Sequence, residues 1–271
     1  MLIDALPIWV LFLVTAALVV LAVEIGFRLG KIVRRRSSEE RESPVSAIAG
    51  AILGLLAFML AFTFSIASER YDTKKSLVRE EANVLRAAWQ RSDFLQDPAR
   101  EKTKALLRDY LDNRLAFVQL SNPDRAETSI SDATRIQHEI WATGVLSAKT
   151  DPFMNSDIGA MYLDSINQMA DLHALRVNQG LQARVPSGIW FVLYALLLLG
   201  MIAVGYQTAI ADSRRSRVTV VLAISFSLVI ALIAALDHPL SRFISIPQTP
   251  LVSLQLEMKS TPELSDSGQQ K

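Results

Sequence analysis

Hydrophobic residues along this chain gather into four long runs separated by polar segments. Residues 5–23, 43–68, 185–211 and 218–236 contain no Asp, Glu, Lys or Arg, and each run has at least 19 residues. A bilayer core about 30 Å thick needs roughly 20 helical residues to cross it. The pattern therefore predicts four transmembrane helices.

The polar stretch between the second and third runs has helical periodicity. Val78, Ala82, Leu85 and Trp89 recur at helical spacing just beyond the second run, with no Gly or Pro among them. Further apolar stripes follow up to the third run. Trp141 is expected on the stripe of a helix from about Ser131 to Ser147, and Met161 on the stripe of the next helix. The fold class predicted is all-α, in which the second and third spans continue unbroken into a water-exposed helical bundle.

These patterns divide the chain into consecutive segments. They are a first transmembrane helix at 1–30, a basic cytoplasmic connector at 31–45, a second transmembrane helix at 46–68, the water-exposed bundle at 69–184, a third transmembrane helix at 185–211, a basic cytoplasmic loop at 212–217, a fourth transmembrane helix at 218–236, an extended segment with a short helix at 237–258, and a disordered tail at 259–271.

Two details concern the water-exposed parts. Leu251, Leu254 and Met258 give the predicted short helix one apolar face. The charged residues that follow the second span are predicted to form the solvated surface of the outer helices. They are Glu69, Arg70, Asp72, Lys74, Lys75, Arg79, Glu80 and Glu81.

Composition narrows the class of function. The formal net charge is only +1, so nothing points to nucleic acid as a partner. Cysteine is absent, which excludes disulfides and thiolate metal sites. His138, His173 and His238 are scattered without a second ligand at metal-binding spacing, and no phosphate-binding loop or nucleophile elbow is present. We expect no metal, no cofactor and no enzymatic activity.

Basic residues predict the orientation in the membrane. Arg34, Arg35 and Arg36 lie in the first short connector, and Arg214 and Arg215 lie in the second. Short loops rich in Lys and Arg face the cytoplasm. We therefore expect a multi-pass membrane protein with the helical bundle on the non-cytoplasmic side.

The second span has two notable stripes. Small residues that share one face suggest close packing against another helix; they are Gly50, Gly54, Ala57, Ala61 and Ser65. Phe58, Phe62 and Ile66 recur every four residues and could instead line a pore as apolar rings, which gate by dewetting. Aromatic residues at this spacing are also common on lipid-facing or core surfaces.

Charged residues near the ends of two spans are candidate interface sites. Glu24 and Arg28 lie one helical turn apart at the end of the first span, where they can pair. Asp237 ends the fourth span, and Arg242 follows at a distance that permits neutralisation. Both acids are interpreted as interfacial anchors, with an ion path as the alternative.

Several short motifs resemble the bestrophin-like domain family of bacterial membrane proteins, over about residues 43–258. They are LGLLAFMLAFTFSIASER at 53–70, Tyr71-Asp72, Glu80-Glu81-Ala82-Asn83, Gly205-Tyr206, Asp237-His238-Pro239 and the stretch Ile246 to Leu251. The resemblance implies a protein of a bacterial inner membrane. The family began as a domain of unknown function, so the likeness alone assigns no activity.

The resemblance implies kinship to bestrophins, which are pentameric anion channels with four spans per subunit and an apolar neck formed by the second span. Phe58, Phe62 and Ile66 would form that neck. The acidic calcium-binding cluster that follows the fourth span in animal bestrophins has no counterpart at residues 237–271. Bestrophins also keep their helical domain in the cytosol, opposite to the side that the arginines predict here.

The leading hypothesis is thus a homo-oligomeric channel, a pentamer by analogy, that passes small anions across a lipid membrane. The alternative is a non-conducting protein in which the spans anchor a helical bundle that binds a partner or scaffolds others.

Overall fold

The computed structural model describes residues 7–36, 42–117, 123–179, 184–211, 218–237 and 244–260. They form helices, and no strand occurs among them, which confirms the predicted all-α class. The chain divides into two compact units. We call Met1–Tyr71 with Arg184–Ile244 the membrane unit, and Asp72–Ala183 with Ser245–Lys271 the bundle unit.

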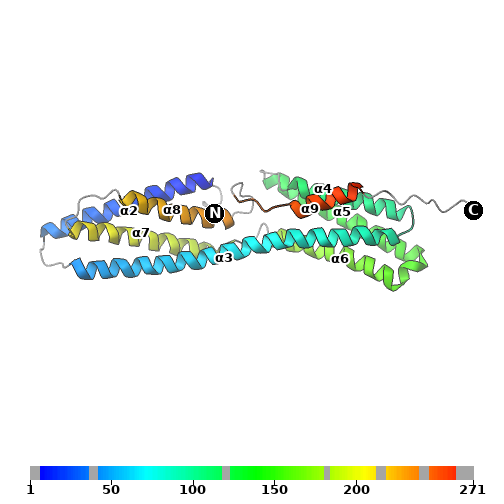
Figure 1. Ribbon diagram of the computed structural model, residues 1–271, viewed down its shortest axis with the longest axis horizontal. Coiled ribbons are helices and arrows are strands. Elements are labelled where there is room, and N and C mark those ends of the chain that lie inside the picture. The colour runs from blue at the N-terminus through cyan, green and yellow to red at the C-terminus, as the bar shows by residue number, and fades with distance from the viewer. Residues whose placement is uncertain are drawn as a thin grey trace, which may run out of the picture. The chain divides into compact units, whose positions relative to one another are not determined.

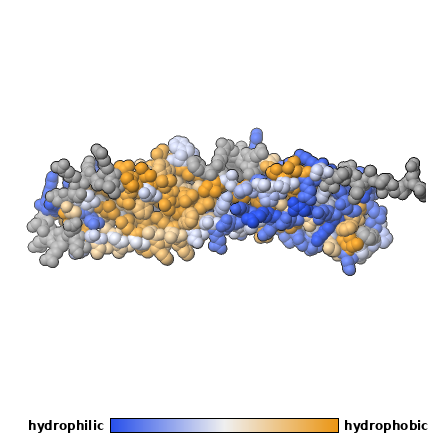
Figure 2. Space-filling view, in the orientation of Figure 1, coloured by the Kyte–Doolittle hydropathy of each residue, from blue (hydrophilic) through white to orange (hydrophobic). Residues whose placement is uncertain are grey.

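Among its described residues, the membrane unit holds four helices long and apolar enough to cross a membrane. They are α2 (Ile8–Arg36), the first half of α3 (Glu42–Arg91), α7 (Ser187–Ile210) and α8 (Val218–Asp237). Helix α2 packs against both α7 and α8 (Figure 1). The visible surface of this unit is largely apolar, as a lipid-facing surface must be (Figure 2).

Helices α2 and α7 approach each other at glycines. A Cβ atom added at Gly26 would lie 2.0 Å from the backbone oxygen of Ile202, and one at Gly205 would lie 2.1 Å from that of Val23. At Gly30, an added Cβ would lie 2.8 Å from the backbone oxygen of Tyr206. Gly26 and Gly30 form a GxxxG pattern, which allows two membrane helices to pack backbone to backbone.

The second and third spans differ in how they lead into the bundle unit. Helix α3 runs for 50 residues without a break, as predicted, because its sequence contains no Pro beyond its first turn. The third span instead starts afresh at Ser187, with extended Pro186 as its N-cap. The predicted unbroken helix into the third span is wrong at this point, because a residue before proline is pushed out of the helical region.

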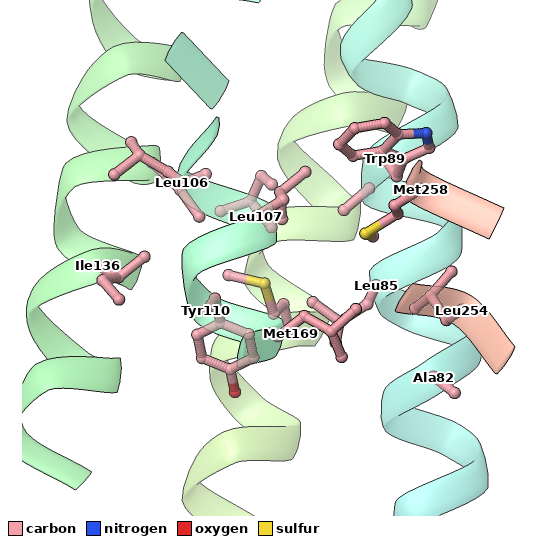
Figure 3. Packing of buried hydrophobic residues seen from close by; sticks show 14 of the residues in the cluster. Ala82, Leu85, Trp89, Leu106, Leu107, Tyr110, Ile136, Met169, Leu254 and Met258 are labelled. Atoms are coloured by element: carbon pink, nitrogen blue, oxygen red, sulfur yellow. The ribbon is translucent and has the colours of Figure 1, made fainter. Parts of the chain in front are cut away.

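In the part of the bundle unit that the structure describes, five helices pack around one core. Besides the second half of α3, these are α4 (Ala99–Phe117), α5 (Pro123–Thr150), α6 (Asp157–Val177) and α9 (Thr249–Ser260). Figure 3 shows Leu85 of α3, Leu107 of α4 and Met169 of α6 converging in this core. Short 3-10 turns, Ser92–Phe94 and Pro152–Asn155, precede α4 and α6.

The C-terminal helix α9 belongs to this bundle. Leu251, Leu254 and Met258 are buried in the bundle core, on the face that the sequence pattern predicts. Figure 3 shows Met258 beside Trp89. The predicted disordered tail lies outside the described residues from position 261 onward.

Helix bounds and core membership differ from prediction at three places. Helix α5 begins at Pro123 rather than near Ser131. Trp141 and Met161, expected on apolar stripes, are 40% and 51% exposed. Each directly follows or precedes a fully buried residue, Ile140 or Tyr162, and neighbouring residues on a helix point about 100° apart.

Candidate functional site

The membrane half of α3 packs against its own chain along a narrow stripe. Ala49, Leu56, Leu60, Thr63 and Ala67 are buried, with spacings of seven, four, three and four residues. Only 17% of the most hydrophobic stretch of α3 is buried, compared with 28% in α2, 33% in α7 and 39% in α8. Most of this helix therefore faces away from the subunit's own core.

The two predicted pore-lining phenylalanines lie on that outward surface. Phe58 is 65% exposed and Phe62 is 53% exposed. Their rings stack with centroids 6.5 Å apart and an interplanar angle of 13°. At about 100° per residue, Phe58 points about 170° and Phe62 about 130° away from the middle of the buried stripe. Both are thus directed away from the rest of the membrane unit.

Ile66 is positioned differently from the two phenylalanines. Four residues advance a helix by about 400°, so each step in this series rotates the side chain by about 40°. Ile66 has consequently turned toward the edge of the buried stripe, where it is partly buried against the membrane-unit core.

The small-residue stripe has no partner inside the described chain. An added Cβ at Gly50 or Gly54 would meet nothing within 4 Å, and Ala57, Ala61 and Ser65 are exposed. Close packing by small residues occurs instead between α2 and α7. Packing of the α3 stripe against another helix therefore stays a prediction.

Glu24 and Arg28 form an ion pair on α2. The Arg28 Nε donates to Glu24 Oε1 at 2.7 Å. The pair is partly exposed, so its contribution to stability is small. This arrangement matches the interfacial anchor interpretation, with a charge neutralised within its own helix.

Asp237 holds together three parts of the membrane unit. Its carboxylate oxygens accept hydrogen bonds from the backbone N–H of Val185 at 3.0 and 3.2 Å, and Oδ1 lies 3.6 Å from Arg70 Nη1. Asp237 thus links the end of α8 to the residues before α7 and to α3. The expected partner Arg242 lies outside the described residues.

The bundle unit contains a buried polar group that we call the Glu81 cluster. Glu81 Oε1 accepts from Arg114 Nε at 3.0 Å and from the Tyr110 hydroxyl at 3.1 Å. Glu81 Oε2 pairs with Arg176. The other members are His173, whose Nδ1 is 3.2 Å from the Tyr110 oxygen, and Gln137, whose amide donates to that oxygen at 3.5 Å.

Burial sets the protonation of this cluster. It raises the pKa of Tyr110 to about 12, so the phenol stays neutral. Burial and the nearby Arg114 charge lower the pKa of His173 to about 4, so the imidazole is neutral near pH 7. Burial lowers the pKa of Arg176 to about 10, which leaves it protonated at neutral pH.

The expected solvated surface is therefore wrong for Glu81 and Lys74, which are 1% and 7% exposed. Glu81 comes three residues after Val78 and four before Leu85, so it shares their buried face. The sequence contains a signal for this burial, because Glu81 is a charged residue within the apolar stripe of its helix. The same signal marks Arg114, four residues after buried Tyr110.

No group of three or more His, Cys, Asp or Glu side chains that could hold a metal ion occurs in the part of the chain that the structure describes. His138 is exposed, and His238 lies outside that part. Of the three histidines, only His173 contributes to a polar site in the described bundle.

Solved structures share this fold. A bacterial bestrophin homologue from Klebsiella pneumoniae superposes with a TM-score of 0.62 at 14% identity, covering 94% of this chain and 99% of that one. A point variant of it gives 0.61 at 12% identity, covering 93% and 99%. A structure described as a membrane protein gives 0.61 at 16% identity, covering 94% and 99%. At these identities the likeness establishes the fold.

No curated protein matches the sequence. A family model described as the Bestrophin-like domain does match, over residues 13–251. Because that match spans nearly all of the four candidate transmembrane helices and most of the bundle unit, the chain belongs to the Bestrophin-like domain family.

Proposed function

We propose that this protein is a homo-oligomeric channel that passes small anions across a bacterial inner membrane, with α3 of each subunit lining the pore. The observation that carries the proposal is the outward, stacked pair Phe58 and Phe62 on the least buried of the four spans. An apolar ring of this kind gates a pore by dewetting.

The two stripes of α3 suit a ring of subunits. The small residues around Gly54 and Ala61 lie about 80° around the helix from the two phenylalanines. In a ring, the phenylalanines would face the axis while the small stripe lies beside a neighbouring subunit. A helix that faces only lipid would not require separate small-residue and aromatic stripes.

Anions as the permeant ions, and five as the number of subunits, rest on the likeness to bestrophins. The ring argument does not depend on either choice. A non-conducting binding or scaffold protein remains the competing function, and it requires no continuous path along α3.

Planar bilayers containing the purified protein test the proposal. In a potassium chloride gradient, we expect a current whose reversal potential lies near the equilibrium potential of chloride. Phe62→Ala should raise the conductance, because it removes bulk from the apolar ring. Phe191→Ala is the matched control, since Phe191 is 76% exposed on α7 and lies outside the proposed pore; it should leave the current unchanged.

Other outcomes separate the alternatives. A reversal potential near that of potassium would contradict anion selectivity while retaining a channel. Silent bilayers over a range of salt and pH, together with a monomer or closed dimer in solution, would favour the binding or scaffold function. Equal effects of the two phenylalanine variants would place the pore elsewhere than along α3.

A further inference from the structure

The Glu81 cluster carries an unbalanced buried charge. Arg114 and Arg176 both pair with Glu81, and among the described residues no other carboxylate pairs with either arginine. The side chain of Arg114 is 3% exposed, that of Arg176 is 11% exposed, and that of Glu81 is 2% exposed. Tyr110 and His173 are neutral, so two positive charges meet one negative charge. A buried charge without a counter-charge is costly, which favours an additional anion.

Hydrogen bonding defines the missing partner further. A carboxylate only accepts, so the single Tyr110 proton goes to Glu81 Oε1. The Tyr110 oxygen must then accept from His173 Nδ1–H, which fixes the neutral imidazole as the Nδ1–H tautomer. His173 Nε2 is therefore an acceptor, and no described residue donates a hydrogen bond to this buried atom.

Arg176 supplies the opposite requirement. A guanidinium has five N–H donors, and only part of this set reaches the Glu81 carboxylate. His173 and Arg176 lie three residues apart on α6, so they share one face of that helix. Arg176 is also the most exposed charged member of the cluster, with 11% of its side chain exposed.

We propose that the cluster binds one small monovalent oxyanion that carries a hydroxyl group, of which bicarbonate is the smallest common example. Its anionic oxygens accept from Arg176, and its hydroxyl donates to His173 Nε2. A planar oxyanion suits the guanidinium because it can accept two parallel hydrogen bonds. Chloride and formate have the charge but lack the hydroxyl. This site is independent of conduction through α3.

Thermal unfolding of the full-length protein in detergent, at pH 8 and constant ionic strength, tests the site. Bicarbonate should raise Tm saturably by about 2–6 °C relative to methanesulfonate, which has no hydroxyl, because a ligand of the folded state stabilises it. Formate and chloride should have at most a small effect. Equal stabilisation by all three anions would show a simple charge effect and overturn the proposal, as would no stabilisation by bicarbonate.

Variants locate the site within the bundle. Arg176→Met should abolish the bicarbonate effect, whereas Arg135→Met should retain it, because Arg135 is an exposed arginine on α5 paired with Glu139. Retention of the effect in Arg176→Met would overturn the assignment. If Arg176→Met does not fold, the comparison of bicarbonate with formate on the unaltered protein still decides between the specific site and a general charge effect.

Discussion

At the scale of single residues, Glu81 has the largest consequences. Its carboxylate is 2% exposed and bridges two arginines that approach from α4 and α6. The bridge connects three helices of the bundle unit through one side chain. Removing one member of such a buried ionic group leaves charges that water cannot reach.

Glu81→Gln should therefore lower the free energy of unfolding by about 3–5 kcal/mol, because Arg114 and Arg176 lose their counter-charge. The measurement is chemical unfolding of the purified protein in detergent. Glu139→Gln is the control: its partner Arg135 is exposed, so a loss of at most about 1 kcal/mol is expected. Equal losses in both variants would contradict the buried bridge.

His173 predicts how stability depends on pH. Its pKa is about 4 in the folded protein and about 6.5 in an unfolded chain, so between these values the unfolded state binds more protons. The contribution of His173 to the free energy of unfolding is then fully present above about pH 6.5. It is lost as the pH decreases toward 4, which lowers the free energy of unfolding by about 1–3 kcal/mol.

The test compares unfolding of the unaltered protein and His173→Gln from pH 4 to pH 8. Between pH 4 and 6.5, the free energy of unfolding of the variant should depend less steeply on pH, because the contribution of His173 is removed. His138→Gln should keep it, because His138 is exposed. A His173→Gln profile parallel to that of the unaltered protein would rule out this origin.

At the scale of helices, the packing of α2 against α7 depends on glycines, which have no Cβ atom to hold the two backbones apart. Gly26 and Gly205 each bring one helix against a backbone oxygen of the other. Membrane helices gain little from hydrophobic exclusion, so close backbone packing of this kind supplies much of their association.

Gly205→Ala should lower the thermal stability of the protein, at a cost of about 1–3 kcal/mol, because the new methyl group overlaps the Val23 carbonyl and the helices must separate. Gly188→Ala on the same helix is the control, since nothing lies within 4 Å of its added Cβ. A Gly205→Ala protein as stable as Gly188→Ala would show that α2 and α7 are not packed this closely.

At the scale of the whole molecule, the side of the membrane that the bundle unit faces is the main prediction. Basic residues in the two short connectors predict that it lies on the non-cytoplasmic side. The likeness to bestrophins implies the cytosolic side instead. The two readings make opposite predictions for any segment of the bundle unit.

A reporter inserted after Asn122, between α4 and α5, distinguishes them. Alkaline phosphatase, which is active only outside the cytoplasm, should be active there, and a fluorescent protein that folds only in the cytoplasm should be dark. The same reporters in the connector around Ser38 should give the reverse pattern. A bright fluorescent insertion after Asn122 would show that the basic residues do not decide orientation here.

Sequence alone determined the four spans, the helical class, the continuation of α3 and the apolar face of α9, because length, hydrophobicity and helical period are properties of a local segment. Tertiary structure decided which faces are covered. It turned Phe58 and Phe62 outward, assigned close glycine packing to α2 and α7, and gathered Glu81, Arg114 and His173 from three helices. Local periodicity shows which face of a helix is apolar, but it does not identify the distant segment that packs against that face.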